Sequence, residues 1–254
     1  MAGFVPYCGS APAPGALHWN VDPILIAALL VFAVAHVSFG RSHSLLNRDL
    51  ASCAFGWFIL LLSFVSPLCN LSVALFSARV SQHMVIVLLA APLIARGLVF
   101  APVDQRRAAS AAWTTTIAFA AVFWIWHSPA FYDATLRNNL VYWLMHATTV
   151  ATALALWTAV FNSRALLAFL VLFVSGLQMS LLGALLTFAA VPLFSVHEFT
   201  TAAWGLTWLQ DQQLGGLVMW VPAGLLLTAY SALAFASALR LDSPDCSRAE
   251  EKWA

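Results

Sequence analysis

Residues 209–222 read Leu-Gln-Asp-Gln-Gln-Leu-Gly-Gly-Leu-Val-Met-Trp-Val-Pro, so that a run of polar side chains leads directly into a long apolar segment. We expect the polar group, from Asp211 to Gln213, to lie at a membrane boundary. A carboxylate in the first turn of a helix is stabilised by unpaired backbone N–H groups and by the helix dipole, which is a structural explanation for Asp211. Gly215 and Gly216 remove side-chain bulk, and small residues in membrane helices favour close helix contact. The stretch predicts a last helix held tightly in a bundle.

The composition excludes a soluble domain. Of 254 residues, 62% are hydrophobic and 8% are charged, and the mean hydropathy is +0.88. A globule of this size has too little interior for so much apolar surface. The formal net charge of +1, without a basic run, argues against a nucleic-acid partner. The N-terminus has no basic region ahead of an apolar core, so we expect the first helix to be retained.

Seven apolar segments are long enough to cross a hydrocarbon core of about 30 Å, which takes ~20 helical residues. We therefore expect an all-α, polytopic bundle of seven transmembrane helices, with Pro67 and Pro92 interrupting the second and third. This divides the chain into an N-terminal tail (1–22), a transmembrane domain (23–240) and a C-terminal tail (241–254). The expected helices lie near residues 23–39, 54–75, 79–99, 108–127, 139–160, 165–191 and 213–239.

The distribution of basic residues predicts the orientation. Nine of the eleven lysines and arginines fall on one side of the expected bundle, and only Arg79 and Arg137 fall on the other. Because cytoplasmic loops are enriched in Lys and Arg, we expect the N-terminus outside and the C-terminus inside. Asp211 then faces outward, towards the periplasm if the source is a Gram-negative bacterium.

Three histidines are the best candidates for chemistry. His83 and His146 lie in the third and fifth expected helices, and His127 ends the fourth. Counting 1.5 Å per residue places them at a common depth in the outer half, near the level of Asp211. Imidazole is the commonest metal ligand, and an ionisable residue inside a membrane is by default a functional hypothesis. The alternative is hydrogen bonding between helices, and His127 could simply cap its helix.

The other histidines have structural or surface interpretations. We expect His18, His43 and His197 to be solvated, since each falls in a tail or a loop. His36 is expected at the inner end of the first helix, where the dipole stabilises a cation.

Sulfur-containing residues leave several possibilities open. Met84 and Met145 neighbour two of the candidate histidines, and core filling is the more common role for each. If they turn inward, thioether and imidazole ligands favour Cu(I), whereas imidazole with the Asp211 carboxylate suits Zn or Cu(II). Cys8 and Cys69 are both expected outside and could form a disulfide, bind a soft metal or do neither.

Six stretches carry a family resemblance: Pro-Tyr-Cys-Gly-Ser-Ala-Pro (6–12), Ser-Pro-Leu-Cys (66–69), Leu-Phe-Ser-Ala-Arg-Val-Ser-Gln-His-Met (75–84), His-Ser-Pro-Ala-Phe-Tyr-Asp (127–133), Leu-Leu-Gly-Ala-Leu-Leu-Thr-Phe (181–188) and Asp-Gln-Gln-Leu-Gly-Gly-Leu-Val-Met-Trp-Val-Pro (211–222). The chain resembles the CtaG-type cytochrome c oxidase assembly factors, seven-helix proteins of bacterial cytoplasmic membranes. The resemblance implies a partner, the subunits of a haem-copper oxidase, and a role in delivering copper or in holding a subunit while its metal centre is filled. It implies no catalysed reaction.

One departure from the family pattern lies at Arg79, where many members carry a histidine that pairs with the one at His83. An arginine cannot ligate a metal, so a site built on that pair is weakened here.

Two other classes of protein compete with an assembly factor. In a membrane cytochrome, His83 and His146 would be the axial ligands of a haem between facing helices. A metal or small-molecule transporter is a further alternative. A retinal-based pump is disfavoured, because the sole lysine, Lys252, lies in the tail and no carboxylate lies within an expected span.

Overall fold

The computed structural model describes residues 4–99 and 104–241. Throughout this part the regular structure is helical, and seven helices are long and apolar enough to cross a membrane, which confirms the predicted fold class. The spans are α1 (Pro23–Ser42), α2 (Asn47–Val65), a composite third span (Phe76–Leu98), α6 (Gln105–Trp126), α8 (Asn139–Phe161), α9 (Ala165–Thr187) and α10 (Trp208–Leu241).

The expected second helix, near 54–75, is wrong at both ends. α2 begins at Asn47 and ends at Val65, and a separate helix, α3 (Pro67–Ala74), follows. Proline lacks the N–H that would continue the helix and disfavours the helical conformation for the residue before it. Ser66 accordingly adopts an extended conformation, with φ −69° and ψ 165°. Pro67 therefore ends one helix and starts the next.

The third span is continuous but irregular. It consists of α4 (Phe76–Val85), a π-helical turn (Ile86–Ala90), α5 (Ala91–Ala95) and a 3₁₀ turn (Arg96–Leu98). Pro92 stands in the first turn of α5, so the change in hydrogen bonding falls on the turn just before it. The expected interruption at Pro92 is therefore wrong, because the span continues past it with only a local change in hydrogen bonding.

The last two helices also differ from their expected bounds. α9 ends at Thr187 instead of near 191, and α10 begins at Trp208 instead of near 213. The polar residues at 211–213 consequently lie inside the first turns of α10. The expected C-terminal tail lies outside the described residues, apart from Leu241.

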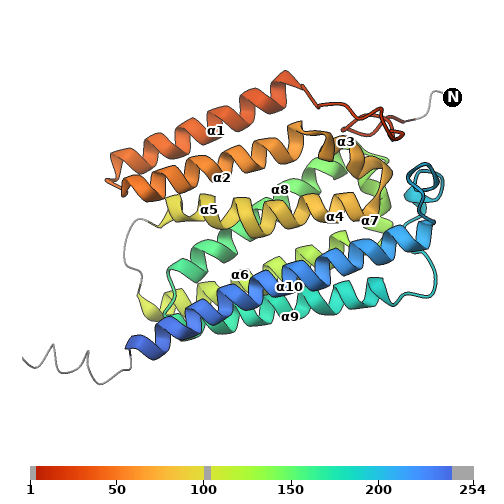
Figure 1. Cartoon of the computed structure of the whole chain (residues 1–254). Coiled ribbons are helices and arrows are strands. Elements are labelled where there is room, and N and C mark those ends of the chain that lie inside the picture. The colour runs from red at the N-terminus through yellow and green to blue at the C-terminus, as the bar shows by residue number, and fades with distance from the viewer. Residues whose placement is uncertain (1–3, 100–103, 242–254) are drawn as a thin grey trace, which may run out of the picture.

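The helices form a bundle with the third span at its centre (Figure 1). This span is the most buried of the seven, while α1 and α2 pair on one side and α9 and α10 on the other. The N-terminal segment, α3, α7 (Pro129–Thr135) and the loop before α10 all lie at one end of the bundle, called the Asp211 end below.

His36 has a structural role, but not the expected one. α1 continues to Ser42, so His36 does not end the helix. Instead, one ring nitrogen lies 3.0 Å from the carbonyl oxygen of Gly97, and the other accepts a hydrogen bond from the Trp57 indole (3.1 Å). These contacts join α1, α2 and the end of the third span.

Candidate functional site

Asp211 lies in the first turn of α10, as predicted, but its hydrogen bonds go to another helix. Its buried carboxylate accepts bonds from the backbone N–H groups of Phe76 (2.7 Å) and Ser77 (3.2 Å), and from the Ser77 hydroxyl (2.5 Å). These residues begin α4, where N–H groups have no partner within the helix. The carboxylate therefore caps α4, the helix that carries Arg79 and His83.

The two glutamines beside Asp211 secure the loop before α10. Gln212 accepts a hydrogen bond from the backbone N–H of Leu193 (2.6 Å), and Gln213 donates one to the carbonyl oxygen of Ala189 (3.2 Å). The polar cluster predicted from the sequence therefore holds the loop before α10 against the start of that helix.

The paired glycines bring α10 against two neighbours. A Cβ at Gly216 would lie 2.6 Å from the backbone nitrogen of Thr187 in α9, and one at Gly215 would meet the Phe76 ring in α4. Gly183 in α9 faces the same contact, since its Cβ would lie 2.8 Å from the carbonyl oxygen of Gly216. This is the close helix packing that the glycines predict.

The three candidate histidines lie together inside the Asp211 end. The ring centroid of His83 is 5.2 Å from that of His146 and 6.3 Å from that of His127. All three side chains are buried. Three helices, α4, α6 and α8, therefore bring imidazoles from distant parts of the chain to one place.

Hydrogen bonds to backbone carbonyls orient two of these rings. Nδ1 of His146 lies 3.1 Å from the oxygen of Tyr142, and Nδ1 of His127 lies 2.7 Å from that of Phe123. A carbonyl only accepts, so each Nδ1 carries the proton and each Nε2 presents a lone pair. Metal-binding histidines are commonly oriented in this way. The Nε2 atoms of His83 and His146 are buried and have no hydrogen-bond partner.

The remaining predicted ligands are less well placed. Met84 and Met145 are buried in the main hydrophobic cluster, as core filling requires. Both oxygens of Asp211 are engaged by α4. Among the residues that the structure describes, no group of three or more His, Cys, Asp or Glu side chains is arranged to hold a metal ion. Two imidazoles, His83 and His146, form the core of the candidate site.

Arg79 was counted among the basic residues on the outer side, but it does not lie at the surface. It is fully buried, and its guanidinium contacts the Thr135 hydroxyl (2.5 Å) and the ring faces of Tyr132 and Tyr142. Its charge acts electrostatically on His83 and on His146. The candidate site therefore includes a permanent positive charge.

The expectation that His197 is solvated is also wrong. It is fully buried, and its Nε2 lies 2.8 Å from the hydroxyl of Tyr132. Burial, and secondarily the charge of Arg79, lower the pKa of His197 to about 3. The apolar residues around it, Phe194 and Val196, were the only local signal that this loop folds inward.

Cys8 and Cys69 form a disulfide, which resolves the alternatives left open by the sequence. The bond fastens the N-terminal segment to α3. The Asn70 side chain adds two hydrogen bonds, to the carbonyl oxygens of Cys8 (3.0 Å) and Ser10 (3.1 Å). The segment is thus fixed over the Asp211 end.

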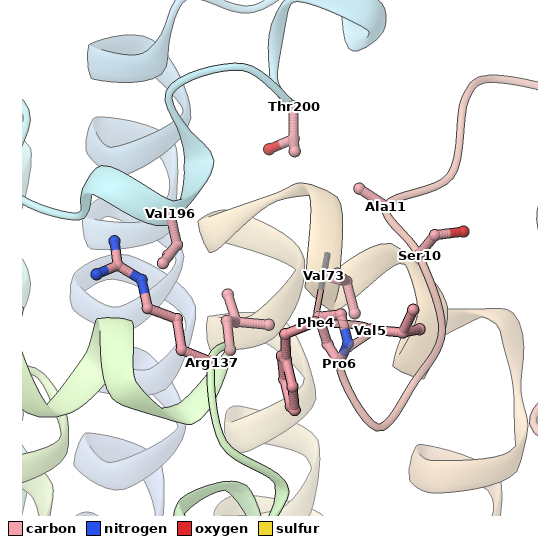
Figure 2. A pocket seen from close by; sticks show the side chains of 10 residues that line it. Phe4, Val5, Pro6, Ser10, Ala11, Val73, Arg137, Val196 and Thr200 are labelled. Carbon is pink, nitrogen blue, oxygen red and sulfur yellow. The ribbon is translucent and has the colours of Figure 1, made fainter. Parts of the chain in front are cut away.

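A surface hollow of about 360 Å³ opens between this segment and the neighbouring loops. Figure 2 shows Arg137 and Val196 on one side and Ser10 and Ala11 on the other. Arg137 donates a hydrogen bond to Ser195 (2.9 Å) and lies 3.7 Å from the carboxylate of Asp133. The hollow is lined by apolar and neutral side chains around one guanidinium.

Seven spans around a buried pair of imidazoles define a polytopic membrane protein with an internal polar site. The family model described as "cytochrome c oxidase caa3 assembly factor" matches residues 28–241, and the chain belongs to this family of oxidase assembly factors. No curated protein and no solved structure matches the chain significantly.

Proposed function

We propose that the protein binds Cu(I) between His83 and His146 and passes it to a subunit of a haem-copper oxidase during assembly. The observation that carries the proposal is the pair of buried, unpartnered Nε2 atoms on rings 5.2 Å apart. Leaving a buried polar atom without a partner costs about 1–3 kcal/mol, so a ligand that engages both nitrogens is favoured.

The ligand set and the local charge favour Cu(I) over divalent metals. Zinc sites in proteins use three or four protein ligands, whereas Cu(I) is stable with two ligands in a linear arrangement. The fixed charge of Arg79 repels an ion in proportion to that ion's charge, so a monovalent cation is opposed half as strongly as a divalent one. The ring of His127 lies 6.3 Å from that of His83 and is not arranged as a third ligand in the described structure.

We infer that the Asp211 end faces the outside of a bacterial cytoplasmic membrane. With Arg79 buried, only Arg137 remains of the two basic residues assigned to this side. The asymmetry in basic residues is therefore stronger than the sequence alone indicates. The disulfide supports the same orientation, because disulfides persist in oxidising compartments.

The packing around His146 disfavours the haem alternative. A haem between His83 and His146 needs a flat slot between the helices. The rings of Phe64 and Tyr142 lie against His146, with centroids 4.9 Å and 4.3 Å away. No specific observation favours a transporter over an assembly factor.

The proposal is tested in cells that depend on this protein for oxidase assembly. His83→Ala and His146→Ala should accumulate normally but lower haem-copper oxidase activity when copper is limiting. Added copper should partly restore activity, because mass action bypasses a weakened donor. His43→Ala, on an exposed residue at the opposite end of the bundle, is the control. Full activity of both site variants under copper limitation would contradict the proposal.

A further inference from the structure

Arg79 is a buried cation without an anionic partner. Its side chain is fully buried, and Nη1 donates to the Thr135 hydroxyl (2.5 Å). Nε and Nη2 are buried and have no hydrogen-bond partner. The described part of the chain has three ion pairs between side chains. They involve Arg48, Arg96 and Arg137, and none involves Arg79.

The surrounding residues compensate this charge only in part. The guanidinium lies 5.4 Å from the ring centroid of Tyr132 and 5.8 Å from that of Tyr142. Cation–π contacts are worth up to about 2 kcal/mol each when desolvated, whereas burying an unpaired ion costs several kcal/mol or more.

The neighbouring acidic groups cannot serve as the counter-ion. Burial raises the pKa of Tyr132 well above its ordinary range, so this phenol stays neutral, and its hydroxyl contacts His197. The carboxylate of Asp211 is held at the start of α4. The described part of the chain therefore supplies no carboxylate within ion-pair distance of the guanidinium.

The two unpaired donors have a defined shape. Nε and Nη2 lie on the same edge of the guanidinium plane and point the same way, so they match the two oxygens of a carboxylate in a bidentate pair. Thr135 occupies Nη1, and the tyrosine rings lie against the guanidinium. The edge that carries Nε and Nη2 is therefore the part of the guanidinium left without a hydrogen-bond partner.

We propose that Arg79 binds a small, free carboxylate anion, of the size of formate or acetate, through Nε and Nη2. Complete burial restricts the ligand to a small anion that enters by local opening of the Asp211 end. The inference goes beyond the proposed copper site, because it requires no metal. The bound anion would also neutralise the charge that opposes a metal at His83 and His146.

The test uses the full-length protein, purified in mild detergent without copper, and equilibrium dialysis against radiolabelled formate. Wild type should bind up to one formate per chain, displaced by acetate but not by the same concentration of chloride. Arg79→Lys keeps the positive charge but loses the two parallel N–H donors, and should weaken binding at least tenfold. Arg79→Gln should abolish it, and Arg137→Gln, which alters an exposed arginine at the same end, should not.

Three results would overturn the proposal. They are no saturable formate binding by wild type, equal displacement by chloride, or formate affinity in Arg79→Lys equal to that of wild type. Should Arg79→Gln fail to fold, Arg79→Lys still decides. Binding of formate by the isolated protein also separates a free anion from an acidic side chain supplied by a client protein.

Discussion

Asp211 in α10 caps α4 through the backbone N–H of Phe76, which lies 2.7 Å from its carboxylate. The two residues are 135 positions apart in the chain. Because α4 carries both Arg79 and His83, this contact fixes the start of the helix that contributes most to the buried polar site. The last helix therefore positions the helix that carries the site.

Removing the cap should destabilise the fold. Asp211→Ala leaves buried N–H groups of α4 without an acceptor, and we expect the free energy of unfolding to fall by about 2–3 kcal/mol. Asp211→Asn keeps one acceptor oxygen and should lose about half as much. Reversible unfolding in mixed micelles measures both. The control is Asp104→Asn, on an exposed residue that makes no capping bond, and a loss at Asp211 no larger than that of this control would contradict the account.

Close packing of α9 and α10 should make their glycines intolerant of bulk. In Gly183→Leu or Gly216→Leu the new Cβ would lie within 2.9 Å of backbone atoms of the facing helix. We therefore expect much lower accumulation of the protein in the membrane. Immunoblots of membrane fractions measure this. Ala118→Leu, on an exposed face of α6, should accumulate normally. Wild-type levels of both glycine variants would show that the helices separate easily.

Burial of His197 predicts a pH dependence of stability. Its pKa is lowered to about 3, whereas an unfolded histidine titrates near 6.5. Between these values the unfolded chain binds a proton that the folded chain does not. The contribution of His197 to stability is therefore present above pH 6.5 and lost as the pH falls towards 3, by up to about 1.4 kcal/mol per pH unit.

Replacing this residue isolates its share of the pH dependence. Going from pH 7 to pH 5, His197→Asn should lose about 2 kcal/mol less unfolding free energy than wild type. His18→Asn, on an exposed residue of the N-terminal segment, should behave like wild type. Identical pH dependence of wild type and His197→Asn would mean that His197 is solvated in the folded protein.

The proposed orientation predicts where a reporter works. A reporter enzyme that is active only outside the cytoplasm should be active when inserted after Gly205, in the loop before α10. It should be silent after Ser44, in the loop between α1 and α2. The reverse pattern would place the disulfide and the histidines at the cytoplasmic side, against the positive-inside rule.

The number of spans could be predicted because each crossing needs about 20 apolar residues, and this requirement is local. Helix ends could not be predicted as well. Pro67 starts α3 instead of kinking a longer helix, and the choice depends on how α3 and the N-terminal segment pack. The polar residues after Trp208 are absorbed into α10 for a similar reason, since their partners lie in other elements.

The common depth of His83, His127 and His146 could be predicted, because depth follows from counting residues along a helix. The burial of Arg79, which was counted among the outer basic residues, and of His197, which was expected to be solvated, could not be predicted in this way. Their burial depends on Thr135 and Tyr132, which lie far away in the chain and supply the hydrogen bonds. Burial of a polar side chain is set by such distant partners, which a local pattern such as the apolar neighbours of His197 does not identify.

The central claim, that His83 and His146 form a Cu(I) site, is tested most directly by metal content. Protein purified in mild detergent is incubated with Cu(I) under reducing, anaerobic conditions, desalted and measured for copper per chain. The account predicts about one copper in wild type and in the His43→Ala control, and at least a tenfold weaker affinity in His83→Ala and in His146→Ala. Copper binding that is absent from wild type, or unchanged in both site variants, would contradict it.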